Sequence, residues 1–215
     1  MSLLRLLPVL FLALLQSAQA QSPGGTAYAG LIDRISGQVT AKSASGNTFQ
    51  PAAFSRVRDG DELNLAAGAE VQVVYFEGRK RESWQGPARF RVKAAGGEPL
   101  SGKAAASSEV KGVPTRVALA AAGNVQRIGG LTLRGGPTKI PDDEAVARAR
   151  ADYAEWIKAA DPADILPELY MIGFLQERRD PDLLAPFVQA MLKKQPDRPE
   201  VRAIAEKLGF PPPAR

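Results

Sequence analysis

The chain has 215 residues with 28 basic and 23 acidic side chains, a formal net charge of +5, and neither cysteine nor histidine. The lack of cysteine excludes a disulfide framework, cysteine nucleophiles and zinc–cysteine sites, and the lack of histidine excludes every histidine-dependent mechanism. Only carboxylates, lysine, serine and tyrosine remain as candidate catalytic groups, and the length suits one or two small domains.

Residues 1–20 predict a secretory signal peptide. Arg5 supplies a positive charge, Leu6–Leu15 is an apolar run, and Ala18-Gln19-Ala20 has the small-x-small pattern of a cleavage site. The apolar run is too short to span a bilayer comfortably, which disfavours the alternative of a membrane anchor. After cleavage behind Ala20 we expect a periplasmic protein with no transmembrane segment.

The first half of the mature chain predicts an antiparallel β domain over residues 30–93, behind a flexible lead-in over 21–29. Glu70–Phe76 is rich in β-branched and aromatic residues. Arg89–Lys93 alternates strictly between basic and apolar side chains, so Phe90 and Val92 should point inward and the three cations outward. Short strands joined by turns at this spacing favour a small sandwich or barrel.

Residues 94–113 are dominated by glycine, alanine and serine and have no sustained period, so we predict a long loop or linker. Residues 114–136 contain two further candidate strands, Thr115–Ala120 and Val125–Arg134. The sequence leaves open whether they belong to the β domain.

The period becomes helical after residue 140, which predicts a helical domain over 141–209 and a tail over 210–215. Asp142–Ala160 predicts the first helix. Asp161-Pro162 and Asp180-Pro181 each combine an N-cap with proline at the first helical position, so they predict the starts of two more helices. The predicted fold class is therefore α+β, with an antiparallel sandwich or barrel-like domain followed by a small helical bundle.

A weak repeat accompanies these start signals. Pro167 and Pro186 follow the two Asp-Pro pairs at the same distance, and Asp197–Leu208 predicts a fourth helix. The simpler interpretation is reuse of one helix-start signal. A short helical-repeat adaptor resembling tetratricopeptide arrays is the alternative, although the motif of those arrays is absent.

The acidic stretch RDGDELNL, residues 58–65, first suggests a metal or catalytic site. As a calcium loop it fails in its middle, because Leu63 and Asn64 occupy positions that need an oxygen ligand and a glycine. As a glycosidase pair it lacks an aromatic platform nearby. Asp59-Gly60 is a strong turn signal, so we predict a turn that feeds a strand into the core, and no metal or cofactor.

The β region contains a series of short motifs, in order Gly37-x-Val39, Phe54–Val57, Arg58–Asp61, Leu63–Leu65, Gly68–Val71 and Val73–Gly78. This series resembles the FecR-like domain, named after the periplasmic regulator of ferric-citrate uptake. Asn64–Gly68 lacks the threonine usual before the glycine, and Glu77-Gly78-Arg79 replaces Asp-Gly-Ser. An unrelated small β domain with similar hairpins is the alternative.

The resemblance implies a role in binding. The regulator carries a cytoplasmic anti-sigma segment and a transmembrane helix before this domain, and neither is found in this sequence. The chain therefore looks like a stand-alone exported FecR-like protein, whose domain would bind another envelope component. The helical domain would supply a second interaction surface.

A basic stretch is the sharpest candidate for a binding surface, because the outward cations of two successive strands are predicted to form one face with a tryptophan beside them. The expected partner is a protein or an anionic envelope component, either peptidoglycan or lipopolysaccharide; export disfavours nucleic acid. The alternative is a solvated strand face that protects edge strands from aggregation. The candidate residues are Arg79, Lys80, Arg81, Trp84, Arg89, Arg91 and Lys93.

The sequence thus predicts a non-catalytic binding, sensor or scaffold module of the cell envelope, without a cofactor. One alternative is a periplasmic enzyme that acts on cell-wall material through carboxylates, and another is a helical-repeat adaptor between proteins.

Overall fold

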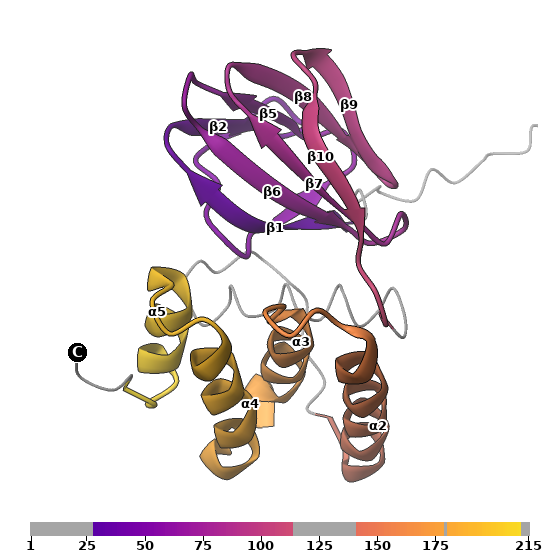
Figure 1. The fold of residues 1–215 in the computed structure, drawn as a ribbon, viewed down its shortest axis with the longest axis vertical. Coiled ribbons are helices and arrows are strands. Elements are labelled where there is room, and N and C mark those ends of the chain that lie inside the picture. The colour runs from indigo at the N-terminus through magenta and orange to yellow at the C-terminus, as the bar shows by residue number, and fades with distance from the viewer. Residues whose placement is uncertain (1–27, 114–140, 179, 212–215) are drawn as a thin grey trace, which may run out of the picture.

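The computed structural model describes residues 28–113, 141–178 and 180–211. The predicted signal peptide and the candidate strands within 114–136 lie outside these residues. The described part contains ten strands followed by four helices and one short 3-10 helix (Figure 1), which confirms the α+β class. Within it, no helix is long and apolar enough to cross a membrane.

The strands form two antiparallel sheets of five strands each. In spatial order, sheet A comprises β10 (Ala104–Glu109), β7 (Lys80–Gln85), β6 (Glu70–Tyr75), β1 (Tyr28–Ser36) and β4 (Arg56–Arg58). In the same way, sheet B comprises β3 (Thr48–Phe49), β2 (Val39–Lys42), β5 (Glu62–Leu65), β8 (Ala88–Lys93) and β9 (Gly96–Ser101).

The two sheets pack face to face as a sandwich. Because side chains alternate along a strand, every second residue of each strand points into the layer between the sheets. The predicted inward direction of Phe90 and Val92 is confirmed, since both are fully buried there. The largest buried residues of this layer are Ile32, Leu63, Leu65, Tyr75, Trp84 and Phe90.

The predicted linker over residues 94–113 is wrong, because most of it forms strands β9 and β10. Both strands lie at sheet edges, and their side chains are mostly exposed. Small residues with nothing to bury give no alternating pattern. The hydrogen bonds to β8 and β7, rather than local propensity, make these segments strands.

The helices are α2 (Asp143–Ala159), α3 (Leu166–Leu175), α4 (Pro181–Lys194) and α5 (Pro199–Lys207), with the 3-10 helix η2 (Gln176–Arg178) after α3. The predicted start of α4 is confirmed, since the Asp180 carboxylate accepts backbone N–H bonds in the first turn. The Asp142 carboxylate caps α2 in a similar way, which was not predicted from the sequence. By contrast, α3 begins at Leu166 and not at the predicted Asp161-Pro162. The Asp161 carboxylate accepts a hydrogen bond from the backbone N–H of Ala163, and the Asp164 carboxylate accepts one from that of Leu166. These bonds stabilise two successive turns before the helix.

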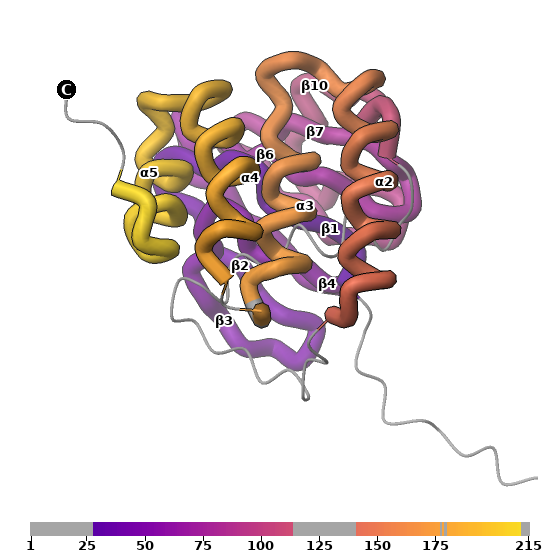
Figure 2. The backbone as a smooth tube through the Cα atoms, turned by 90° about the horizontal axis from the view of Figure 1, so that it is seen from below, coloured from indigo at the N-terminus to yellow at the C-terminus, as the bar shows by residue number. Residues whose placement is uncertain are grey.

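The four helices lie side by side beneath sheet A (Figures 1 and 2), so the molecule has three layers: sheet B, sheet A and helices. Leu31 and Val74 of sheet A, and Phe76 directly after β6, share one hydrophobic core with Trp156 and other helical residues. The part of sheet A around Val73 and Val74 is therefore buried on both faces, which explains the unbroken apolar run of residues 73–76. The helical bundle thus shares its core with sheet A.

Candidate binding surface

The acidic stretch before strand β5 is a turn, as predicted. The Asp61 carboxylate accepts a hydrogen bond from the backbone N–H of Arg58 at 2.8 Å, and the Asp59 carboxylate accepts one from Ala94 at 3.1 Å. Gly60, between them, has a φ of +90°, which glycine adopts without strain. The two carboxylates hold backbone groups and do not face each other across a cleft.

The position of Asp61 gives a pH-dependent prediction. Its burial raises the pKa of the carboxyl above the ordinary value of 3.8, although the hydrogen bond from Arg58 opposes the shift. A raised pKa in the folded state means that ionisation above this value costs stability. Relative to Asp61→Asn, the natural protein should therefore lose stability as pH rises from 3.8 through the raised pKa. Urea unfolding of both proteins at a series of acidic pH values measures this, and the opposite slope would contradict the burial argument.

The basic residues of β7 do not share a face, contrary to the prediction. Alternation turns Lys80, Glu82 and Trp84 toward sheet B and Arg81 toward the helices. The Lys80 ammonium lies 2.7 Å from the Glu82 carboxylate. Arg79 is exposed in the turn before β7, with a φ of +47°. Moreover, β7 belongs to sheet A and β8 to sheet B, so their cations cannot form one surface.

Trp84 is also not on a surface, since only 1% of it is exposed. Its ring stacks on Phe90, with centroids 4.1 Å apart and planes 13° apart. The indole Nε1 donates a hydrogen bond to the buried Glu82 carboxylate at 3.2 Å. A Cβ on Gly97 would lie 2.6 Å from the Trp84 ring, so the packing is tight. Trp84 cannot stack on a sugar in this fold.

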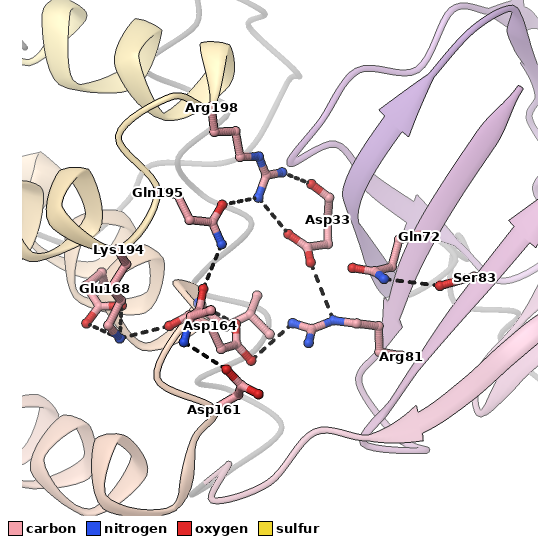
Figure 3. Close-up of polar contacts among 12 residues, drawn as sticks. Asp33, Gln72, Arg81, Ser83, Asp161, Asp164, Glu168, Lys194, Gln195 and Arg198 are labelled. Carbon is pink, nitrogen blue, oxygen red and sulfur yellow. Dashed lines mark hydrogen bonds and ion pairs between the residues drawn. The ribbon is translucent and has the colours of Figure 1, made fainter.

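Arg81 joins sheet A to the helices (Figure 3). Its guanidinium lies 3.4 Å from the Asp33 carboxylate and 3.1 Å from that of Asp164, just before α3. Arg198, at the start of α5, contacts Asp33 from the other side, with 3.3 Å between the guanidinium and the carboxylate. It also donates to the Asp33 backbone oxygen. These groups are partly or fully buried, so Arg81 connects layers and is not free for a partner.

A second ion pair lies between α3 and α4. The Lys194 ammonium contacts the Glu168 carboxylate at 2.9 Å and the backbone oxygen of Asp164 at 2.8 Å. The Tyr153 hydroxyl donates to the same carboxylate at 3.1 Å. Burial, together with the negative charge of Glu168, raises the pKa of the Tyr153 hydroxyl.

The outer face of sheet B holds the remaining predicted cations. Four strands place Lys42, Glu62, Arg91 and Glu98 opposite one another in one row of alternating charge. The Arg91 guanidinium lies 2.7 Å from Glu62 and 3.7 Å from Glu98. The hydrogen bond from Arg91 lowers the pKa of Glu62, and the same bond raises the pKa of Arg91.

The neighbouring row is not neutralised in this way. It runs from Thr40 through Asn64 and Arg89 to Ser101. Arg89 is exposed and makes no hydrogen bond or ion pair within the described residues, although its charge contributes to lowering the pKa of Glu62. Lys93, further along β8, is 3.9 Å from Glu98 and exposed. Arg89 therefore presents an uncommitted guanidinium between an amide and a hydroxyl.

These two rows, together with Lys93, form a polar surface that we call the open face of sheet B. No helix of the described part covers it (Figure 1). Four of its side chains are cations and two are carboxylates, so it keeps a net positive charge. The surface consists of Thr40, Lys42, Glu62, Asn64, Arg89, Arg91, Lys93, Glu98 and Ser101.

The structure thus brings together Arg89, Arg91 and Lys93 of the predicted set, and separates Arg79, Lys80, Arg81 and Trp84 from them. Lys42 and Asn64 also lie on this surface and were not predicted from the sequence. Strand alternation in β2 and β5 could have shown that both point away from the core, but only the strand order places them beside β8.

Within the described residues, no group of three or more Asp or Glu side chains is placed to hold a metal ion. No protein-family model matches the chain, and no curated protein or solved structure matches it either. The resemblance to FecR-like domains accordingly stays a prediction.

Proposed function

We propose that this chain is a non-catalytic binding module of the bacterial cell envelope, exported to the periplasm, which captures an anionic envelope component on the open face of sheet B. Peptidoglycan and lipopolysaccharide are the two sources of anionic groups to separate by experiment. The resemblance to FecR-like domains supports the same kind of role.

One observation carries this proposal: Arg89 is exposed and unpaired within the described residues, on a sheet face of net positive charge. A guanidinium presents a planar fork of donors that matches a carboxylate or phosphate, and neighbouring amide and hydroxyl groups can bind sugar or peptide oxygens. An open sheet face suits an extended polymer, whereas small molecules usually bind in concave sites.

The roles of the carboxylates favour binding over the alternative of carboxylate catalysis. Asp59 and Asp61 hold a turn, and the buried Glu82, Asp164 and Glu168 each contact a cation or backbone N–H groups. A glycosidase needs two carboxyl groups facing each other about 5–10 Å apart across a sugar. The adaptor alternative is weakened because the helices bury apolar side chains against sheet A, so the β part is more than a cap.

Charge reversal on the open face tests the proposal. The double variant Arg89→Glu/Lys93→Glu should sediment with purified peptidoglycan sacculi, or bind lipopolysaccharide, at least about tenfold more weakly than the natural protein, because lost attraction is replaced by repulsion. The loss should be greatest at low salt, where exposed charges are least screened.

A matched control is the variant Arg148→Glu/Lys158→Glu on the outside of α2, where both side chains are about two-thirds exposed. It changes the net charge by the same amount on a different surface. Equal losses in both variants would show a dependence on net charge alone, and unchanged capture by the open-face variant at low salt would eliminate this surface.

A further inference from the structure

A recess lies on sheet A, at the edge of the area that the helices cover. It is a groove of about 320 Å³, with strands β1, β6 and β7 as its floor and the start of α5, Arg198 and Glu200, as its wall. The volume lies at the lower end of the range for small-molecule sites, so the groove suits a ligand of few residues and not a polymer.

Two cross-strand rows of polar side chains make the floor. Arg34, Gln72 and Ser83 lie opposite one another in the first row, and Ser36, Glu70 and Gln85 in the second. The preceding row on the same face, Leu31, Val74 and Arg81, is covered by the helices. The groove is therefore the uncovered continuation of a face that is otherwise buried.

A β-bulge aims Arg34 into this groove. The pairing of β1 with β6 shifts between Ile32 and Arg34, which leaves Asp33 without an opposite residue. Ile32 and Ile35 both pack between the sheets, so the two residues between them can both face the helices. Bulges commonly redirect side chains in this manner. Strict alternation would have placed Arg34 inside the sandwich.

The charges of the groove single out Arg34. Arg198 is committed to Asp33 and to Glu200, whose carboxylate it contacts at 3.2 Å. The Arg34 side chain is exposed and makes no hydrogen bond or ion pair within the described part of the chain. Arg34 is thus an uncommitted cation with the carboxylates of Glu70 and Glu200 in the same lining.

The first row also has hydrogen-bonding capacity left over. The Gln72 amide N–H donates to the Ser83 hydroxyl oxygen at 3.1 Å (Figure 3). This leaves the hydroxyl hydrogen as a donor and the Gln72 amide oxygen as an acceptor. A donor and an acceptor side by side match the C=O and N–H of one peptide unit.

We propose that this groove binds a short peptide through its free C-terminal carboxylate, which pairs with Arg34 while Gln72 and Ser83 bind the adjoining peptide unit. A carboxylate accepts two parallel N–H bonds from a guanidinium. Glu70 and Glu200 repel a doubly charged phosphate group more strongly than a singly charged carboxylate. They attract the positively charged amino end of a short peptide. The proposal depends on the groove alone and stands apart from the open face of sheet B.

Titration with alanyl-alanine, followed by isothermal calorimetry and by backbone amide shifts, tests this assignment. The free dipeptide should bind saturably, and its C-terminal amide should bind at least about tenfold more weakly because the charge-assisted pair is lost. Shifts should concentrate in β1, β6 and β7. Inorganic phosphate should compete poorly.

Variants separate the site from general charge effects. Arg34→Gln should abolish binding, Arg34→Lys should retain part of it, and Arg150→Gln on the exposed side of α2 should leave it unchanged. Since Arg34 is exposed, all three should keep the thermal midpoint of the natural protein. Equal binding of acid and amide, undiminished binding by Arg34→Gln, stronger binding of phosphate, or no saturable binding at millimolar dipeptide would each overturn the proposal.

Discussion

Replacement of Lys194 by methionine should lower the free energy of unfolding by about 3–5 kcal/mol, because removal of one partner of a buried ion pair leaves an uncompensated charge. Glu168 is 0% exposed, and the Lys194 ammonium is its only cationic partner among the described residues, at 2.9 Å. The Tyr153 hydroxyl would remain as a donor at 3.1 Å, but a single neutral donor does not balance a buried carboxylate. Urea denaturation measures the loss.

A double-mutant cycle shows whether the charge is the cause. Glu168→Gln/Lys194→Met should be more stable than Lys194→Met alone, since the amide carries no charge that needs a partner. Lys193→Met, at the exposed neighbouring position, should change stability by less than about 0.5 kcal/mol. If Lys194→Met costs no more than Lys193→Met, the pair between α3 and α4 is not what stabilises their contact.

Much of the fold could be predicted from local patterns. Period-two alternation in Arg89–Lys93 placed Phe90 and Val92 in the core, and the Asp180-Pro181 signal located the start of α4, because both patterns act within a few residues. Strands β9 and β10 could not be found in this way. Their hydrogen-bond partners lie in β8 and β7, and their own side chains carry no pattern of burial.

The prediction of one basic surface on β7 and β8 was wrong for a related reason. Adjacent strands in the sequence were expected to be neighbours in space, but β7 pairs with β6 and β10, whereas β8 pairs with β5 and β9. Strand order depends on contacts distant in sequence, so the sequence alone could not separate Arg81 from Arg89. The bulge at Asp33 is another such feature, and it decides where Arg34 points.

The burial of Trp84, which was predicted to lie at a binding surface, can be tested by substitution. Trp84→Ala should cost about 3–5 kcal/mol of stability, because it empties a fully packed site between the sheets. It removes the stacking on Phe90 and leaves the buried Glu82 carboxylate without the indole N–H, so the loss should lie toward the upper end. Trp84→Phe keeps an aromatic ring on Phe90 and should cost less than the alanine variant.

The same variants decide between a structural and a ligand-binding tryptophan. If Trp84 stacked on a sugar, its replacement by alanine would abolish the binding of sacculi while the protein stayed folded. We expect the reverse: a lower urea midpoint, with the molecules that remain folded still captured through the open face of sheet B. Full stability of Trp84→Ala combined with lost capture would contradict the burial of this ring and restore it as a binding residue.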